Sequence, residues 1–371
     1  MIRKTMKFLR SDIVFTLSMV LAALSCMIIP PNIKYLDYID YNTLILLFCL
    51  MLIMEGLKEL NFFQYIGKMV LDKVKTERGI IFTLVFLCFV SSMFITNDVA
   101  LITFIPFGIL ILEMTGLTSM LCLTITLMTI AGNLGSMLTP IGNPQNLYLF
   151  SVSHTNIKDF LLLMLPYSVI SAVLITAFIM LSYRKTAITI RLEKTEKMEN
   201  RKVCMYLLLF LLCLLAITGF ISKGLLLMVV SFCLLVGDRH LFLKADYPLL
   251  LTFIFFFIFI GNFNNLKGLH KIIIRILENH ERIVSIGISQ IISNVPAAVL
   301  LSNYTTDYKE IIIGTNLGGL GTLIASMASL ISYKQITGKY PHLKNGYLLK
   351  FTSCNLIFLI LLYTISVTAL H

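Results

Sequence analysis

The sequence predicts an all-α polytopic membrane protein with two inverted-topology repeats, each containing a re-entrant hairpin and a discontinuous transmembrane helix. Hydrophobic residues fill 58% of the 371 positions and charged residues only 13%, whereas about 25% of a typical soluble domain is charged. Apolar runs of about 20 residues, long enough to cross the hydrocarbon core, recur along the chain. Two short polar signatures each occur twice in apolar surroundings, which predicts an internal repeat.

The apolar runs predict about nine membrane crossings and two hairpins. The expected crossings are 13–30, 43–58, 120–149, 161–183, 203–220, 224–237, 249–263, 313–333 and 347–369. Two further apolar stretches, 80–113 and 283–301, each carry one copy of the first polar signature. We interpret both as re-entrant hairpins, because irregular backbone at membrane depth requires protein or a water-filled cavity to satisfy its amides.

The basic residues predict the orientation. With the N-terminus in the cytoplasm, 22 of the 30 Lys and Arg residues fall in the cytoplasmic segments 1–12, 57–79, 184–202, 237–248 and 333–350. This distribution agrees with the positive-inside rule. A traversing 283–301 segment would instead place the lysines of 333–350 outside. We therefore expect a cytoplasmic N-terminus, an external C-terminus and hairpins that enter the cell (inner or plasma) membrane from opposite sides.

These assignments divide the chain into four parts. Residues 1–42 form an N-terminal transmembrane helix and external loop, and the many later spans favour this over a cleaved signal peptide. The first repeat covers 43–183, with its hairpin at 80–113 and its broken helix at 120–149. A cytoplasmic linker follows at 184–202. The second repeat covers 203–371, with its hairpin at 283–310 and its broken helix at 311–333.

The two repeated signatures are specific as a set. The first reads Ser92-x-x-Ile95-Thr96-Asn97-x-x-Ala100 and returns as Ser289-x-x-Ile292-Ser293-Asn294-x-x-Ala297. The second reads Asn133-Leu134-Gly135-x-x-x-Thr139-x-Ile141 and returns as Asn316-Leu317-Gly318-x-x-x-Thr322-x-Ile324. Single Asn or Gly residues of this kind are often only kinks in ordinary helices. Recurrence of both full patterns argues for paired functional elements instead.

Broken segments of this type can bind ions. Half-helix N-termini carry partial positive charge that suits an anion, whereas unwound carbonyls suit a cation such as Na⁺. The expected solute-binding residues are Thr96, Asn97, Asn133, Gly135, Thr139, Asn143, Ser293, Asn294, Asn316, Gly318 and Thr322. The expected coupling-ion residues are Asp98, Thr96, Asn97, Gly132, Ser293 and Asn294, with Na⁺ at the hairpin tips as the candidate metal.

Asp98 is the most specific single candidate. It follows the first tip asparagine in a stretch that is otherwise free of charge from Ile80 to Leu112. An intramembrane carboxylate is a functional candidate by default, as a proton carrier or cation ligand. The alternative is a helix-cap acid satisfied by backbone amides. No Lys, Arg or His lies in the middle of an expected span, so an anion would be held by amides, hydroxyls and dipoles, with a co-bound cation.

At these residues the chain resembles the ion transporter superfamily, which includes divalent-anion/sodium symporters, citrate transporters and arsenite permeases. The motifs that carry the resemblance are Thr96-Asn97-Asp98, Ser293-Asn294-Val295, Ala131 to Gly135 with Thr139 to Asn146, and Asn316 to Thr322. The resemblance covers about residues 13 to 369. Dicarboxylate carriers have Ser-Asn-Thr at both tips. Here the third position is Asp98 or Val295, so the tips look more like the arsenite-permease side of the superfamily.

The resemblance implies a secondary active transporter of a small anion or oxyanion (organic carboxylate, citrate-like or arsenite-like) coupled to Na⁺ or H⁺. It also implies solute and ions between the tips, no cofactor, surrounding membrane lipid, and a homodimer with elevator-like motion. No nucleic-acid partner and no enzymatic activity are expected. The alternatives are a Na⁺/H⁺ antiporter without an anion substrate, a passive ion channel, or an intramembrane aspartyl protease with Asp238 in a weak motif.

Overall fold

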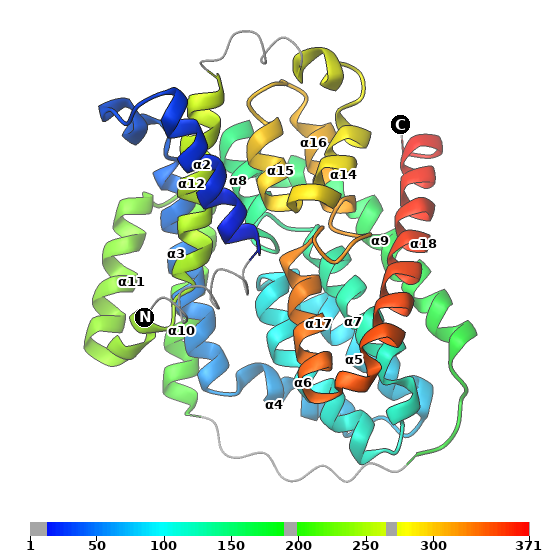
Figure 1. Cartoon of the computed structure of the whole chain (residues 1–371). Coiled ribbons are helices and arrows are strands. Elements are labelled where there is room, and N and C mark those ends of the chain that lie inside the picture. Colours follow the sequence, from blue (N-terminus) through cyan, green and yellow to red (C-terminus); the bar gives the residue numbers. More distant parts are fainter. Residues whose placement is uncertain (1–12, 189–198, 265–272, 371) are drawn as a thin grey trace.

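The computed structural model describes residues 13–188, 199–264 and 273–370, and nearly all of their regular structure is helical (Figure 1). Extended pairing within these ranges is an isolated antiparallel bridge between Thr76 and Ala187. Six of the described helices have the length and apolar composition to cross a membrane. The prediction of an all-α polytopic membrane protein is therefore confirmed.

One group of helices, the scaffold bundle, comes from the N-terminal part of the chain and from the beginnings of the predicted first and second repeats. It consists of α2 (Ile13–Ile28), α3 (Tyr41–Glu59), α10 (Asn200–Ile217), α11 (Lys223–Gly237) and α12 (Tyr247–Asn264), with the 3₁₀ turns η1 (Ile33–Tyr38) and η3 (Arg239–Leu243). Helix α2 packs along α12, while α10 and α11 pack on α3. Asp238, after α11, accepts hydrogen bonds from Lys202 and Tyr206 of α10, so it is part of the packing between these helices.

The other group, the hairpin bundle, contains both predicted hairpins and both predicted broken helices. It consists of α4 (Phe62–Leu71), α5 (Glu77–Ser91), α6 (Asn97–Met114), α7 (Leu121–Ser136), α8 (Pro144–Ser153), α9 (Ile157–Ser182), α14 (Glu281–Ile292), α15 (Asn294–Leu301), α16 (Tyr308–Leu317), α17 (Met327–Lys339) and α18 (Lys344–Thr368). The two bundles meet where α3 packs on α8 and α12 on α15.

The first half of the hairpin bundle contains the stretches 80–113 and 120–149. The first stretch forms α5 and α6, joined by residues 92–96, and the second forms α7 and α8, joined by residues 137–143. Pro144 occupies the first turn of α8, where its missing N–H removes no intrahelical bond. The side chain of Thr76 caps α5 by accepting the N–H of Gly79.

The second half repeats this order, and α14, α15 and α16 are shorter than their counterparts α5, α6 and α7. Ser293, between α14 and α15, has a backbone φ of +79°, a value that is costly for a residue with a Cβ and marks a sharp reversal. After α16, residues 318–326 are irregular and include Gly321 at φ +108°. Helix α15 has only 8 residues, whereas α6 has 18. This difference accounts for most of the shorter spacing between Asn294 and Asn316 than between Asn97 and Asn133.

The two hairpins point in opposite directions (Figure 1). The outer ends of α5 and α6 lie on the side of α4 and of the segments 115–120 and 183–188, here called the linker side. The outer ends of α14 and α15 lie on the opposite side, here called the far side, with the loops 154–156 and 302–307. Inverted repeats require such an arrangement, but the structure contains no membrane, so the re-entrant hairpins and the orientation stay predictions.

Candidate functional site

The first hairpin tip is fixed against the break between α7 and α8. Asn97 is 3% exposed and is the first residue of α6. Its backbone N–H donates to the Gly142 carbonyl at 2.9 Å, and its Nδ2 donates to Asn133 Oδ1 at 3.0 Å. Its Oδ1 accepts the N–H of Asp98 at 2.9 Å. The side chain of this predicted solute ligand is therefore already hydrogen-bonded within the protein.

The second tip repeats the same backbone contact. The N–H of Asn294, the first residue of α15, donates to the carbonyl of Ala325 at 3.0 Å. Gly142 and Ala325 both stand two residues before the second part of a broken helix, α8 or α17. The first N–H of each tip helix, α6 or α15, is thus bonded to a carbonyl just before the helix that resumes after the neighbouring break, α8 or α17.

Gly135 and Gly318 occupy the same position in the two copies of the second signature, and packing explains why both are glycine. A Cβ on Gly135 would lie 2.0 Å from the Phe89 carbonyl oxygen, and one on Gly318 would lie 2.7 Å from Ser289 Oγ. Both glycines therefore allow a broken helix to approach the first arm of its hairpin closely. Gly132, a predicted coupling-ion residue, faces the Leu101 side chain within the helical contact of α7 and α6.

The threonines of the second signature hold the same interface. Thr139 donates its hydroxyl to the Met93 carbonyl and accepts the N–H of Gly142. Thr322 donates its hydroxyl to the Gln290 carbonyl at 3.1 Å. Both predicted solute ligands thus link the break in a helix to the neighbouring hairpin, and Thr322 is exposed.

Two buried asparagines join the two halves. Asn133 donates its Nδ2 to the Gly319 carbonyl at 3.3 Å, and its Oδ1 accepts the hydroxyl of Ser326 at 3.0 Å. Asn316 donates its Nδ2 to Asn146 Oδ1 at 2.7 Å. Helix α7 of the first half therefore bonds to the irregular segment 318–326 of the second half, and α16 of the second half bonds to α8 of the first. These bonds hold the two breaks against each other.

Between the tips and the breaks lies a small void, here called the tip void, of about 10 Å³. It is lined by Asn97, Asp98, Asn143, Pro144, Gln145, Leu249, Asn294, Val295, Ser326 and Met327. With the exception of Leu249, these residues belong to the starts of four helices, α6, α8, α15 and α17. Of the predicted site residues, the structure brings Asn97, Asp98, Asn143 and Asn294 together here.

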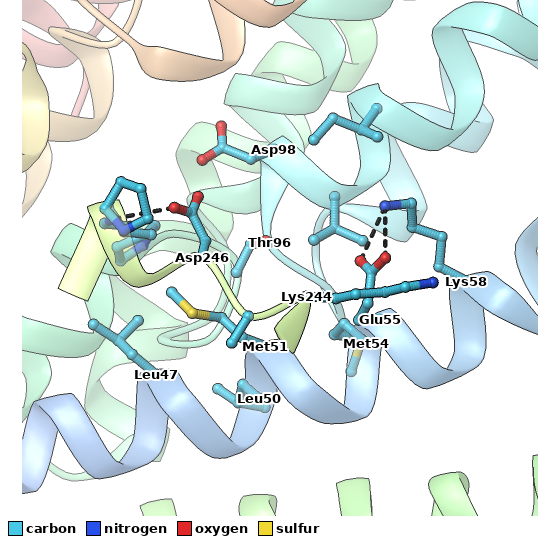
Figure 2. Close-up of a pocket in the computed structure, with 16 residues that line it drawn as sticks. Leu47, Leu50, Met51, Met54, Glu55, Lys58, Thr96, Asp98, Lys244 and Asp246 are labelled. Atoms are coloured by element: carbon cyan, nitrogen blue, oxygen red, sulfur yellow. Dashed lines mark hydrogen bonds and ion pairs between the residues drawn. The ribbon is translucent and has the colours of Figure 1, made fainter. Parts of the chain in front are cut away.

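A larger cavity, here called the side cavity, adjoins the tip void on the linker side and has a volume of about 380 Å³. Asp98, Pro144 and Leu249 line both spaces. Figure 2 shows the Asp98 and Asp246 carboxyl groups at one side and the Glu55–Lys58 pair at the other. The wall between them is apolar and includes Leu47, Leu50, Met51 and Met54 of α3. Thr96 also lines this cavity rather than the tip void.

The two lysines of the side cavity are engaged by carboxylates. Lys58 Nζ lies 2.9 Å from Glu55 Oε2, and Lys244 Nζ lies 2.5 Å from Glu59 Oε1. The Glu59 carboxylate also raises the pKa of Lys244, which therefore stays charged at neutral pH. Among the described residues, no group of three His, Cys, Asp or Glu side chains is placed to hold a metal ion. A cation in this region would be bound chiefly by amide, hydroxyl and single carboxylate oxygens.

The predicted site did not include Gln145 and Ser326 of the tip void or Asp246 of the side cavity. Gln145 stands within the Thr139-to-Asn146 motif, and Asp246 belongs to an Asp-Tyr pair that echoes Asp40-Tyr41 ahead of another apolar run. The sequence around both residues therefore marks them as candidate site residues. Ser326 lies two residues after Ile324, the last position of the repeated signature, and has no matching residue type in the first half.

Comparison with known proteins agrees with this architecture. The citrate transporter family profile matches residues 1–308. An uncharacterized transporter of Methanocaldococcus jannaschii, MJ0456, is 35% identical over 301 residues, which cover 81% of this chain and 82% of the relative. The inner membrane protein YbiR of Escherichia coli is 30% identical over 310 residues, 80% of each chain.

A third relative, the putative transporter arsB of Dictyostelium discoideum, is 28% identical over 149 residues, 40% of this chain and 26% of the relative. The family profile is that of citrate transporters, and two of these relatives, MJ0456 and arsB, are described as transporters rather than enzymes. The chain is therefore a multi-pass membrane transporter, and it belongs to the citrate transporter family.

Proposed function

We propose that this chain is a secondary active transporter that carries a small anion or oxyanion across the cell membrane, coupled to Na⁺ or H⁺. The observation that supports an anion is the convergence of four helix N-termini on the tip void. Each N-terminus contributes partial positive charge, and together the four favour a negatively charged or oxygen-rich solute. The side cavity provides room beside it for the rest of a small solute.

Replacing either tip asparagine is expected to abolish uptake while expression and membrane insertion persist. Asn97→Ala removes the bond to Asn133, and Asn294→Ala removes the corresponding amide from the wall of the tip void. The measurement is uptake of radiolabelled citrate, dicarboxylates, sulfate and arsenite into proteoliposomes under an imposed Na⁺ or H⁺ gradient. Uptake that does not saturate, or that ignores both gradients, would favour a passive channel over the proposed transporter.

A Na⁺/H⁺ antiporter without an anion substrate is the second candidate, because Asp98 lines both the tip void and the side cavity, where Asp246 also lies. Asp98→Asn is expected to remove the Na⁺ or pH dependence of transport, since an amide cannot carry a proton and binds cations more weakly than a carboxylate. Dissipation of a pH gradient by Na⁺ in the absence of any anionic solute distinguishes the two functions. Wild-type coupling in Asp98→Asn would exclude this carboxylate as the carrier.

A further inference from the structure

A further large cavity, here called the basic cavity, lies on the far side and has a volume of about 440 Å³. The scaffold bundle lines it with the start of α3, the end of α10 and the start of α11. The hairpin bundle lines it with the end of α8 and the start of α9. A ligand in the basic cavity therefore contacts both bundles at once.

The titratable side chains that line the basic cavity are two lysines and a histidine. Lys158 comes from the hairpin bundle, Lys223 comes from the scaffold bundle, and His154 ends α8. The described residues that line the cavity include no Asp or Glu. Asp159 follows Lys158 in the chain, but it accepts a hydrogen bond from Asn156 and does not line the cavity. Neither lysine forms an ion pair within the described part of the chain.

Both lysines stand at the electrostatically unfavourable end of their helices. Lys158 is the second residue of α9, and Lys223 is the first residue of α11. A helix N-terminus carries partial positive charge, so it repels a cation and attracts an anion. An anion between the two lysines would offset this repulsion at both helices. The charges and the helix polarity thus select for the same kind of ligand.

The distribution of basic residues along the chain singles out the same pair. In the predicted orientation eight Lys and Arg residues are external, and five of them flank the second hairpin within 264–310. The other three are Lys34, Lys158 and Lys223. External lysines in short loops oppose the positive-inside rule. The structure brings two of these three into one cavity, although they belong to different bundles.

The basic cavity lies at the depth of the lipid head groups. Helices α3, α9 and α10 are long and apolar enough to cross a membrane, and all three have their far-side ends there. Phe220, which lines the cavity, is 82% exposed. Below it α9 exposes Leu162, Leu165 and Val169 by 56%, 45% and 53%. A phospholipid can cover such an apolar surface with its acyl chains, whereas a free anion cannot.

We propose that the basic cavity binds the phosphate head group of an anionic phospholipid, which Lys158 and Lys223 hold from opposite bundles. Lysine is a common ligand of phosphate, and basic pockets between transmembrane helices bind lipid head groups. Asn42 and Thr218 line the same cavity and supply further hydrogen-bond donors. The bound lipid links the two bundles on the far side. The basic cavity is separate from the tip void and the side cavity, so the inference goes beyond the proposed transport function.

The test measures how lipids stabilise the purified protein in dodecyl maltoside micelles. Palmitoyl-oleoyl phosphatidylglycerol is expected to raise the melting temperature, because a ligand that binds the folded state stabilises it. Phosphatidylcholine with the same acyl chains and inorganic phosphate are both expected to raise it much less. The first carries a cation beside its phosphate, and the second has no acyl chains. The lipid concentration that gives half of the full shift reports the affinity.

Removing the lysines is expected to weaken the response to phosphatidylglycerol. Lys158→Gln and Lys223→Gln should each raise the half-maximal concentration roughly fivefold, and the double variant roughly thirtyfold, because each lysine contributes separately to binding an anionic lipid. The lipid-free double variant is expected to melt at or above the wild-type temperature, since it loses the repulsion at two helix N-termini. Lys158→Arg/Lys223→Arg retains both charges and is expected to keep the preference for phosphatidylglycerol.

Lys34→Gln is the matched control. Lys34 is exposed, belongs to η1 of the scaffold bundle and does not line the basic cavity. It removes the same charge from the same side of the protein, and it is expected to change the half-maximal concentration by less than about twofold, because solvent and salt screen an exposed charge.

Three results would overturn the assignment. One is equal stabilisation by phosphatidylglycerol and phosphatidylcholine, and another is an equal response to phosphatidylglycerol in the double Gln variant, the wild type and Lys34→Gln. The third is stabilisation by inorganic phosphate as large as that by phosphatidylglycerol, which would give the cavity to a free anion. None of these results bears on gradient-driven uptake, so failure of this assignment is distinguishable from failure of the proposed function.

Discussion

Asn133→Ala is expected to abolish uptake and to lower the melting temperature of the purified protein by the largest amount among the substitutions of the site. The change removes the acceptor for Asn97 Nδ2 and Ser326 Oγ and the donor to the Gly319 carbonyl. Each buried group left without a partner costs roughly 1–3 kcal/mol. The loss of three hydrogen bonds therefore amounts to roughly 3 kcal/mol or more, and both halves lose a shared contact.

Asn355→Ala is the matched control for this effect. Asn355 is likewise buried, but among the described residues its Nδ2 bonds only to the Phe351 carbonyl in the same helix, α18. Its replacement is expected to lower the melting temperature little and to preserve uptake. Thermal denaturation in detergent and uptake into proteoliposomes measure the two variants side by side. Equal losses in both variants would show that Asn133 acts as ordinary core rather than as the link between the halves.

Arg282→Met is expected to be the most destabilising change outside the site. The Arg282 guanidinium binds both carboxylate oxygens of Glu310, at 2.7 and 2.6 Å, and donates to the Ser366 carbonyl at 2.8 Å. These bonds connect the first arm of the second hairpin to α16 and to α18. Removing one partner of a largely buried ion pair leaves the other charge uncompensated, at a cost of roughly 3–5 kcal/mol. Glu310 retains 25% exposure, which favours the lower end of that range.

The double variant Arg282→Met/Glu310→Met separates the ion pair from general packing. It removes both charges, so we expect it to regain much of the stability that Arg282→Met loses. The comparison of single and double variants by thermal denaturation gives the coupling between the two side chains. A double variant that melts at or below the temperature of Arg282→Met would show that the stem packing of Arg282, not its charge, holds the second hairpin in place.

The recurrence in the sequence predicted which segments meet, but it did not separate packing residues from solute contacts. Gly135 and Gly318 recur because each allows a close approach to a hairpin arm, and Thr139 and Thr322 recur because each bonds to the equivalent carbonyl of that arm. Such contacts are needed twice in a duplicated fold. They would therefore be repeated whether or not the solute touches them.

Polar residues that line the tip void in only one half give no repeat signal. The matching contacts of Gly142 and Ala325 place Gln145 in correspondence with Ala328 of α17. A search for repeated polar residues consequently passes over Gln145. Ser326 corresponds to Asn143, so both halves are polar at that position but the residue types differ. Whether a side-chain amide is paired depends on contacts between segments far apart in the chain, and the sequence alone does not reveal them.

The unequal helix lengths place the tip void away from the middle of the hairpin bundle. Toward the linker side α5, α6, α7 and α17 have 15, 18, 16 and 13 residues, but toward the far side α8, α14, α15 and α16 have 10, 12, 8 and 10. At about 1.5 Å per residue the far-side helices are on average shorter by roughly a third.

The membrane potential acts on a charge in proportion to the share of the voltage drop that the charge crosses, about 2.3 kcal/mol per elementary charge for a full 100 mV. With the bundle spanning the bilayer along these helices, an ion that arrives from the far side crosses the smaller share. The voltage sensitivity of transport is then concentrated in the steps that exchange ions with the linker side.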